Sequence, residues 1–533
     1  MKKENIIMCL IDVVIVLVLY YFELPPLNLT SPLFWHFTFM VLFIILISLS
    51  IKDGHKIIIK RQLNMNLFNI YKFFFLVIGG IFAIIVIINA VSSPLFNAKG
   101  YSERIVVDET HKFTNDIAPV DFSKTPLVDK DSSQKLGDRK MGEFTSWVSQ
   151  FYVSDLYTQI NYNNEIVRVT PIEYDGIIKY FTNRDEGIKG YIIVNSVDGS
   201  ANLVNLDKGM KYLPSAYFFE NLYRKLRFDY PTTIFDEASF EIDNDGNPYW
   251  IIPTVKYIAI GLKKEISGVV ILNPITGESK KYDVKDIPTW VDHVYDADLI
   301  IEQIDNWGEY RNGFFNSIFG QKDVINTTEG YNYLVMDDDV YLYTGITSVS
   351  SDESNLGFVL VNLRTKETKY YLVPGAEEYS AMASAEGLVQ EKDYVASFPL
   401  LINLNNKPTY LLSLKDNAGL VKMYAFIDVA DYQKVVVSDA SLGIGAAAEK
   451  YLGESFSGNN ENLLEKDIII KSITSAVIEG NTNYYIIDDK NNLYFTSIKV
   501  AREILPFLKP EDKIHIKYNK GNVSQIASIE VTK

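Results

Sequence analysis

Three long apolar stretches dominate the first hundred residues and predict a membrane anchor. They cover about residues 6–22, 33–51 and 73–95. A helix needs roughly 20 apolar residues to cross about 30 Å of hydrocarbon, and each stretch is close to that length. In the third, from Phe73 to Val91, the only strongly polar side chain is that of Asn89. Residues 1–96 are therefore expected to form three transmembrane helices.

Basic residues are distributed unevenly around these stretches, and the asymmetry predicts an orientation. The connection over residues 23–32 contains no Lys or Arg. The N-terminus and the second connection are basic, with Lys2, Lys3, Lys52, Lys56, Lys60, Arg61 and Lys72. Because cytoplasmic segments carry the excess of Lys and Arg in membrane proteins, we expect a cytoplasmic N-terminus. After three crossings, the chain beyond residue 96 should be extracytoplasmic.

The first stretch also contains an acidic residue, Asp12. An ionised carboxylate at the centre of a transmembrane helix costs roughly 2.5–3.5 kcal/mol, so such a group needs a proton or a partner. Asp12 is not at the centre of the stretch and lies toward its cytoplasmic end. We expect it to be protonated or bonded to a neighbouring helix. A role in transport or in pairing with a partner helix is the alternative.

The pattern becomes polar after the anchor. Residues 97–143 contain Pro119 and Pro126 and show neither a helical nor a strand period, which predicts a linker or an extended arm. From residue 144 onward, short runs of alternating apolar and polar residues predict strands, and a few segments of helical character lie between them. The fold class that this pattern indicates is α+β.

The α+β region repeats itself, which predicts two related units over residues 144–300 and 301–440. Each of three segments in the first unit has a counterpart in the second. The pairs are GYIIVNSVDGSANLVNL and GFVLVNLRTKETKYYLV, DNDGNPYWIIPTVK and NLNNKPTYLLSLKD, and GVVILNPITGESKKYDV and MYAFIDVADYQKVVVSD. The segments begin at Gly190 and Gly357, at Asp243 and Asn403, and at Gly268 and Met423.

Each unit places a helical segment, from Ser215 or Glu378, before a pair of strands, and this order resembles the PepSY domain. In the first unit Pro248 and Tyr249 open a strand. The family's Thr-Gly-Glu turn is matched by Asn273, Pro274, Thr276, Gly277 and Glu278. The second unit has DVADYQK at that place. The resemblance implies a helix packed on a short antiparallel sheet. It also implies an extracytoplasmic protein, often beside a membrane anchor, that holds or inhibits other proteins rather than catalysing a reaction.

The C-terminal part has a different pattern. Residues 441–466 are expected to form a linker. From residue 467, three alternating runs, one short helix and two further runs resemble an OB-fold, which is a small Greek-key barrel. Four aromatic side chains on its strands are a possible binding surface: Tyr484, Tyr485, Tyr494 and Phe495. Because they stand at alternating positions, half of them are expected in the core.

Composition narrows the function. The net charge of −16 disfavours nucleic acid, whose binding depends on cationic side chains near the phosphates. Cys9 is the only cysteine, so no intramolecular disulfide can form, and a thiol nucleophile is excluded outside the anchor. The abundance of Ile, Lys, Asn and Tyr is typical of low-GC Gram-positive bacteria.

Two acidic clusters are candidates for a cation site. One is the run Asp243, Asp245 and Asn247, and the other is Asp337, Asp338 and Asp339. Asp-Gly between two alternating runs also favours a tight hairpin turn, and both clusters fit hairpin apices. The sequence contains no H-E-x-x-H or paired-cysteine pattern, so no cofactor and no catalytic residue is assigned.

These observations predict a membrane-anchored, extracytoplasmic protein of the cell envelope that is not an enzyme. The aromatic content of 13%, much of it Tyr, suits recognition of another protein or of an envelope polymer, because Tyr combines apolar area with a polar tip. Two alternatives remain open. One is a sensory or regulatory subunit of a membrane complex, and the other is an envelope enzyme that uses paired carboxylates.

Overall fold

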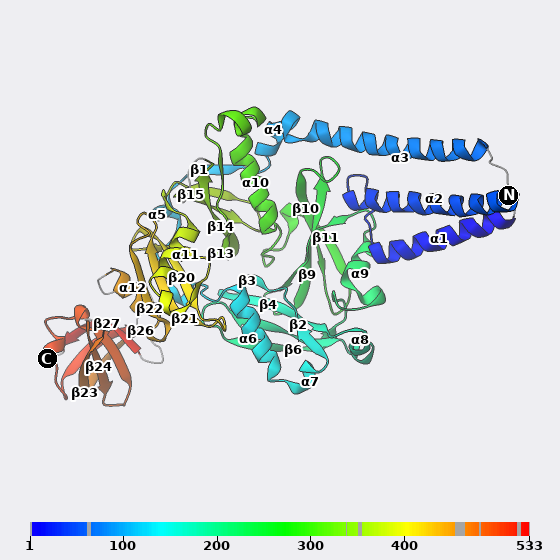
Figure 1. The fold of residues 1–533 in the computed structure, drawn as a ribbon. Helices are drawn as coiled ribbons and strands as arrows, with labels where there is room; N and C mark the ends of the chain where they lie inside the picture. The colour runs from blue at the N-terminus through cyan, green and yellow to red at the C-terminus, as the bar shows by residue number, and fades with distance from the viewer. Residues whose placement is uncertain are drawn as a thin grey trace. The chain divides into compact units, whose positions relative to one another are not determined.

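The structure of the protein is a computed structural model that describes residues 3–60, 65–336, 338–349, 354–452, 464–478, 481–519 and 524–531. Three long helices come first: α1 (Lys3–Glu23), α2 (Pro32–Lys60) and α3 (Met65–Ser92). Within them, Ile6–Glu23, Pro32–Ile51 and Tyr71–Ser92 are long and apolar enough to cross a membrane. The prediction of three membrane-length helices is confirmed (Figure 1). Helix α2 contacts both α1 and α3.

The rest of the chain is a mixed α+β structure in two compact units. Unit 1 contains Met1–His111 and Pro126–Leu372, and unit 2 contains Lys112–Thr125 and Val373–Lys533. Residues 97–143, which the sequence predicted as a linker, are part of these folded units. Their buried apolar side chains, among them Tyr101, Ile105 and Val120, follow no regular period. The elements here are α4 (Pro94–Ser102), β1 (Val107–His111), α5 (Phe113–Asp116), η1 (Phe122–Lys124) and α6 (Lys130–Gly142).

Four small sheets with the same connectivity form most of the α+β region. Each sheet contains a meander, in which four consecutive strands pair in order. A short strand that precedes the meander in sequence pairs with the second strand of the meander as well. These pairings are antiparallel, and a helix precedes each sheet. In sheet 3, β1 also pairs in parallel with the last strand.

The elements of sheet 1 are α6, β2 (Phe151–Val153), β3 (Thr158–Tyr162), β4 (Glu165–Tyr174), β5 (Ile188–Asn195) and β6 (Ala201–Met210). Those of sheet 2 are α9 (Leu222–Asp229), β7 (Ile234–Phe235), β8 (Ser239–Ile242), β9 (Pro248–Tyr257), β10 (Lys264–Leu272) and β11 (Ser279–Asp283). Those of sheet 3 are α10 (Ala297–Tyr310), β12 (Ile325–Thr327), β13 (Asn332–Met336), β14 (Asp339–Ser348), β15 (Ser354–Asn362) and β16 (Thr368–Tyr371). Those of sheet 4 are α11 (Glu378–Gly387), β18 (Val395–Ala396), β19 (Leu400–Leu404), β20 (Lys407–Lys415), β21 (Val421–Asp428) and β22 (Val435–Asp439).

Shorter elements connect these strands. They are α7 (Thr145–Val148), α8 (Ile177–Asn183), η2 (Phe218–Glu220), η3 (Val284–Asp286), η4 (Asn316–Gly320), β17 (Gly375–Ala376), η5 (Gln390–Lys392), η6 (Ala440–Leu442) and α12 (Ile444–Leu452). The last of these places a helix in the segment 441–466, for which the sequence predicted a linker.

The turn after the third meander strand is common to all four sheets. The Oδ1 atom of Asn195, Asn273, Asn362 or Asp428 accepts hydrogen bonds from the backbone N–H groups two and three residues later. Short amide and carboxylate side chains favour this turn because they reach their own backbone. The sequence matches join sheet 1 to sheet 3 and sheet 2 to sheet 4, so each unit of the expected duplication contains two such sheets.

Sheet 2 lies between two hydrophobic clusters of unit 1. Trp250 and Leu272 pack with residues of sheet 1, whereas Ile251 and Val269 pack with α10 and sheet 3. Both faces of β9 and β10 are therefore buried. This explains why these strands read as nearly continuous apolar runs rather than as alternating ones.

Unit 2 joins a short early segment of the chain to sheet 4. The side-chain Nδ2 of Asn403 donates to the carbonyl of Ile117 at 2.7 Å, and the N–H of Val120 donates to the carbonyl of Asn403 at 2.8 Å. The ring of Phe122 also contacts that of Phe426, with centroids 5.9 Å apart. Residues 112–125 therefore belong to the structure that contains sheet 4.

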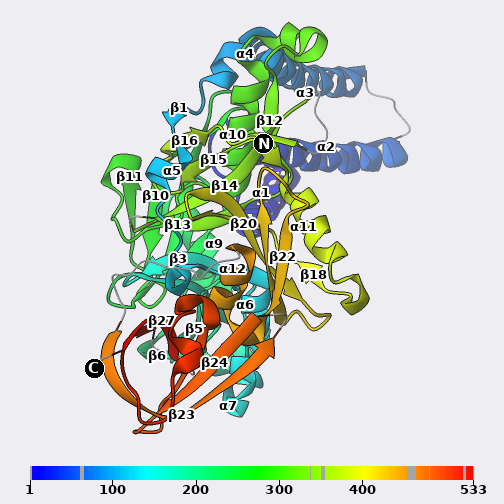
Figure 2. The same cartoon turned by 90° about the vertical axis from the view of Figure 1, so that its left-hand side faces the viewer.

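The C-terminal part forms a closed barrel with the strand order β23-β24-β25-β27-β26, coloured orange to red in Figure 2. The expected five-stranded barrel is confirmed. Two short 3-10 turns, η8 (Ile498–Val500) and η9 (Leu505–Phe507), stand where the sequence predicted a short helix. The strands are β23 (Leu464–Ile478), β24 (Asn481–Asp488), β25 (Leu493–Ser497), β26 (Lys513–Asn519) and β27 (Ser524–Val531).

Candidate ligand-binding groove

An open groove of about 720 Å³ lies in unit 1 at the end of sheet 2 where β10 turns into β11. Ligand pockets usually measure about 300–1,000 Å³, so the volume suits a ligand of several rings. The lining includes three tyrosines and two lysines: Tyr212, Tyr249, Tyr282, Lys225 and Lys280. The turn Asn273–Glu278, on which the PepSY resemblance was based, forms one edge.

The turn fixes one tyrosine in place. Gly277 has a φ of +75°, and a Cβ atom added there would lie 2.4 Å from ring atoms of Tyr212. A glycine is therefore required both by the backbone conformation and by the ring above it. The backbone of Tyr212 is held on both sides, since its N–H donates to Pro274 at 3.0 Å and its carbonyl accepts from the indole of Trp250 at 2.9 Å.

The other two tyrosines rise from the sheet itself. Tyr249 opens β9 and lies beside Trp290, with ring centroids 5.1 Å apart. Burial is the main cause that raises the pKa of Tyr249, so its hydroxyl stays protonated at neutral pH and can donate a hydrogen bond. In β11, Tyr282 and Lys280 are two residues apart and share a face, and the ammonium of Lys280 lies 4.6 Å from the ring centre of Tyr282.

The groove combines aromatic area with mixed polar groups. The ammonium of Lys225 lies 6.0 Å from the ring of Tyr212 and also forms an ion pair of 2.5 Å with Asp229. Glu278 adds a carboxylate to the lining. The cations are therefore partly balanced by acids. Such a surface can stack flat apolar faces on tyrosine rings while hydroxyl, ammonium and carboxylate groups form hydrogen bonds with the rim of a ligand.

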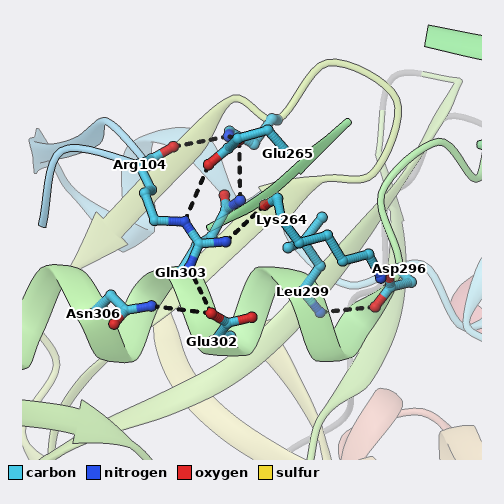
Figure 3. Close-up of polar contacts among 9 residues, drawn as sticks. Arg104, Lys264, Glu265, Asp296, Leu299, Glu302, Gln303 and Asn306 are labelled. Carbon is cyan, nitrogen blue, oxygen red and sulfur yellow. Dashed lines mark hydrogen bonds and ion pairs between the residues drawn. The ribbon is translucent and has the colours of Figure 1, made fainter. Parts of the chain in front are cut away.

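Strand β10 leads from the groove to an ion-pair network near its other end. Figure 3 shows this network. The guanidinium of Arg104, with 2% of its side chain exposed, pairs with Glu265 at 3.1 Å and with Glu302 at 2.6 Å. It also donates to the carbonyl of Lys264 at 2.7 Å. Lys366 adds a bond of 2.8 Å to the carbonyl of Arg104. The segment after the third apolar helix is thus fixed to sheet 2, α10 and sheet 3.

The β9–β10 turn beyond this network binds the apolar helices directly. The side-chain amide of Asn89 in α3 donates to the carbonyl of Ile260 at 2.9 Å and accepts from its N–H at 3.2 Å. The N–H of Gly261 donates to the carbonyl of Thr30 in the α1–α2 connection at 3.1 Å. The polar residue that stood out in the third apolar stretch therefore pairs with backbone groups of the α+β region. Asp12 accepts a hydrogen bond of 2.5 Å from Ser48 of α2.

The two acidic clusters proposed from the sequence serve hairpin turns or polar contacts within unit 1. Both oxygens of Asp243 accept hydrogen bonds from its own turn, including the N–H groups of Asp245 and Asn247. Asp338 accepts from Asn161 at 2.7 Å, and Asp339 forms a bidentate pair with Arg364 at 2.7 Å. Asp337 lies outside the described residues. Among the residues that the structure describes, no three His, Cys, Asp or Glu side chains are grouped to hold a metal ion.

The aromatic residues proposed for the barrel divide between its interior and its exterior. Tyr494 is 2% exposed and lies in the core, against which Tyr484 also packs. Tyr485 and Phe495 are paired across β24 and β25, with ring centroids 5.7 Å apart, and both are partly exposed. The candidate surface of the barrel is thus reduced to these two rings.

A pair of buried acids was not foreseen. Glu241 and Asp292 are 0% and 2% exposed, and burial raises the pKa of both, that of Glu241 to about 7. The oxygens of Glu241 accept the N–H groups of Asp292 and His293, and Asp292 accepts that of Asn161. These carboxyl groups fix the chain where sheets 1 and 2 meet α10. Because Glu241 and Asp292 are 51 positions apart in the sequence, no local pattern predicts that they form a pair.

The groove residues were also missed, apart from Tyr249 and the glycine turn. Alternation within SKKYD indicates that Lys280 and Tyr282 share a face. Nothing local indicates that Tyr212, before α9, lies across the turn from them. That contact depends on the pairing of residues 211 and 212 with Pro274.

Fold and groove define the class of protein: a mixed α+β chain with three membrane-length helices, small antiparallel sheets and a terminal barrel. No family model matches the sequence, and no curated protein matches it. Among solved structures, Trypanosoma rangeli sialidase is similar at 9% identity and a TM-score of 0.16, with 71% of this chain and 54% of that chain covered. The same sialidase with the inhibitor DANA gives 10% identity and a TM-score of 0.14, over 71% and 54%. The match spans about half of the sialidase chain.

Proposed function

We propose that the protein is a membrane-anchored binding protein of the cell envelope, that its α+β region is extracytoplasmic, and that the groove of sheet 2 binds an envelope polymer. The observation that carries this proposal is the groove itself, to which sheet 2, helix α9 and the segment before α9 together contribute three tyrosines and two lysines. The PepSY-like order of helix and sheet supports a holding role rather than catalysis.

A saccharide polymer suits the groove better than a compact ligand. The groove is open, so a chain can enter and leave at its ends. The apolar faces of sugar rings stack on tyrosines, and their hydroxyl groups form hydrogen bonds with polar groups such as Lys280 and Glu278. The mixed charge of the lining favours a neutral or weakly charged polymer over a strongly anionic one.

The direct test is binding of the detergent-solubilised full-length protein to purified envelope polysaccharide and peptidoglycan. We expect Tyr249→Ala and Tyr282→Ala each to weaken retention at least tenfold, because a buried aromatic contact typically contributes more than 1 kcal/mol to binding. Tyr152→Ala is the matched control, because this exposed tyrosine of β2 lies outside the groove. Equal retention of all three variants would contradict the proposal.

The orientation is tested separately. Protease added to intact protoplasts should digest the region after residue 96 and leave the connection between α2 and α3 uncut. If this region is cut only after lysis, the α+β region is cytoplasmic, and an envelope polymer cannot be its ligand.

A regulatory subunit is a second candidate, which one observation favours. Strand β10 has 9 residues, a length of about 30 Å, with the groove at one end and the contacts to Arg104 and Asn89 near the other. A ligand in the groove would thus be connected to α3 through a single strand. Copurification of another membrane protein, lost in Asn89→Leu, would support this role. An Asn89→Leu protein that retains the partner would oppose it.

A further inference from the structure

Exposed aromatic rings line α9 and the short η2 turn before it. Phe219 and Phe228 are 61% and 45% exposed, and their ring centroids are 5.6 Å apart. Each ring also contacts the last turn of α1, Phe219 with Tyr21 at 6.0 Å and Phe228 with Tyr20 at 6.2 Å. The aromatic row therefore continues from an apolar helix onto the α+β region.

Polar contacts hold α9 against the same helix end. The buried Arg227 donates to the carbonyl of Leu24 at 2.9 Å and to that of Thr233 at 2.6 Å. The guanidinium of Arg224 lies 4.2 Å from the ring centre of Tyr21. These bonds keep the aromatic rings of α9 at the level where the span Ile6–Glu23 ends.

The β9–β10 turn reaches the same level from the other side. Ile258 is 58% exposed at this turn, although Ala259 beside it is buried. The turn is bonded to Thr30 in the α1–α2 connection and to Asn89 near the end of α3, so it lies where all three apolar helices end on one side. If the three helices cross a bilayer, an isoleucine exposed at this place lies close to the bilayer surface.

We propose that Phe219, Phe228 and Ile258 form a lipid-contacting face, and that α9 and the β9–β10 turn lie in the interfacial layer of the leaflet that contains the C-terminal end of α1. The partner of this face is the bilayer. Amphipathic aromatic rings prefer the headgroup level, and Tyr20 and Tyr21 already stand there. The α+β part of unit 1 would thus rest on the membrane rather than project from it, and its orientation toward the surface would be fixed.

Spin labelling of the full-length protein in liposomes of phosphatidylcholine and phosphatidylglycerol tests this face. In a Cys9→Ser background, nitroxide is attached after Phe219→Cys or Ile258→Cys, and collision with oxygen is compared with collision with a water-soluble nickel chelate. Val86→Cys in α3 reports lipid, and Asn202→Cys in β6 reports water. We expect oxygen to relax the labels at 219 and 258 at least threefold more effectively, relative to nickel, than the label at 202.

Two results would overturn the proposal. Nickel-favoured collisions at 219 and 258, as at 202, would place both residues in water. Labels that neither reagent reaches would place the face against protein, such as a second copy of the chain. As a further check, Phe219→Asp combined with Phe228→Asp should shift the label at 258 toward nickel. Phe219 is 61% and Phe228 is 45% exposed, so we expect the two substitutions to leave the fold intact, and circular dichroism of the variant verifies this.

Discussion

Gly268 shows how a missing side chain allows two strands to pair. A Cβ atom at this position would lie 2.0 Å from the carbonyl oxygen of Tyr282 on β11. Gly190 and Gly357 occupy the same place in sheets 1 and 3, five residues before the Asx turn, and would meet carbonyl oxygens at 2.6 and 2.2 Å. In sheet 4 the corresponding residue is Met423, next to which the pairing of β20 and β21 shifts in register. That sheet therefore accommodates a side chain at this position.

We expect Gly268→Ala to lower the free energy of unfolding by about 1–3 kcal/mol, because the strand backbone must shift to admit a methyl group. Gly142→Ala at the end of α6 is the control. Its Cβ would meet no atom within 4 Å, so stability should change by less than about 1 kcal/mol. Denaturant unfolding in detergent micelles measures both variants, and equal stability of the two would contradict the clash.

Glu173 predicts a dependence of stability on pH. Burial raises the pKa of this carboxyl group to about 7, against hydrogen bonds from the N–H and hydroxyl of Ser215 that lower it. A carboxyl group that binds its proton more tightly in the folded state than in the unfolded state contributes stability that is complete below about pH 4.5 and is lost as pH rises through 7.

The isosteric Glu173→Gln variant cannot ionise and should not lose this contribution. Between pH 4.5 and 8, we expect the stability of the natural protein to fall relative to the variant by up to about 3 kcal/mol, since one pKa unit corresponds to about 1.4 kcal/mol. Glu329→Gln, at an exposed position, is the control. The measurement is the melting temperature of each protein across this pH range. A difference between Glu173→Gln and Glu329→Gln that does not change with pH would refute the assignment.

At the level of residues, the sequence identified unusual side chains but not their partners. Asn89 stood out because it is polar within an apolar stretch, yet Ile260, to which it binds, is 171 positions away. The hairpin turn at Asp243 is a local structure, so its hydrogen bonds could be predicted from the residues beside it. Grooves and buried acid pairs depend on contacts between distant segments, which local patterns do not encode.

At the level of elements, the buried Arg104 network should be essential for stability. We expect Arg104→Ala to cost about 3–5 kcal/mol, because it leaves Glu265 without its buried partner. Lys99→Ala removes an exposed pair with Glu103 and should cost no more than about 1 kcal/mol. Limited proteolysis and denaturant unfolding compare the two. If Arg104→Ala lowers the free energy of unfolding no more than Lys99→Ala does, the network contributes little to stability.

The pairing of Asn89 with the β9–β10 turn should protect that turn. In Asn89→Leu we expect amide hydrogen exchange at Ile260 to increase at least tenfold, because its N–H loses the side-chain acceptor. Thr38→Val is the matched control, since the hydroxyl of Thr38 donates within α2, to the carbonyl of Phe34. Unchanged exchange at Ile260 would contradict the contact.

Elements with a regular period were predicted well, and irregular ones were not. The three apolar helices and the barrel strands were evident from hydropathy and alternation. Residues 97–143 gave no apolar period because α4 buries only Tyr101, β1 has no fully buried residue, and α6 buries Met141 together with serines and a glycine. The sequence predicted two related units, and each of them contains two sheets: sheets 1 and 2 in the first, and sheets 3 and 4 in the second. Similarity between neighbouring sheets is confined mainly to the Asx turn and the strand order.

At the level of the whole molecule, the groove and the barrel belong to different units. We therefore expect a chain truncated after residue 452 to keep the polysaccharide affinity of the full-length protein within twofold, since every groove residue lies in unit 1. Retention on polysaccharide measures this, with Tyr249→Ala in the truncated chain as the control. A large loss on truncation would assign a part of the binding to Tyr485 and Phe495.

The order of parts along the chain, with anchor, α+β region and barrel, followed from the sequence. The division into two units did not, because unit 2 takes residues 112–125 from the middle of unit 1. A segment of this length with no clear period contains no signal for the structure that it will join.

The assignment of residues 112–125 to unit 2 has a consequence for biosynthesis. Residues 112–125 leave the ribosome long before Asn403, with which they pair, so they remain without this partner while the residues of sheets 1–3 are synthesised. A chain that stalls before residue 403 would present Phe113, Ile117 and Phe122 uncovered, a natural point for a chaperone to act. The chain passes between the two units at three places, on either side of this segment and at residue 372. Cleavage by a protease at one of these places would therefore leave the two units connected through the others.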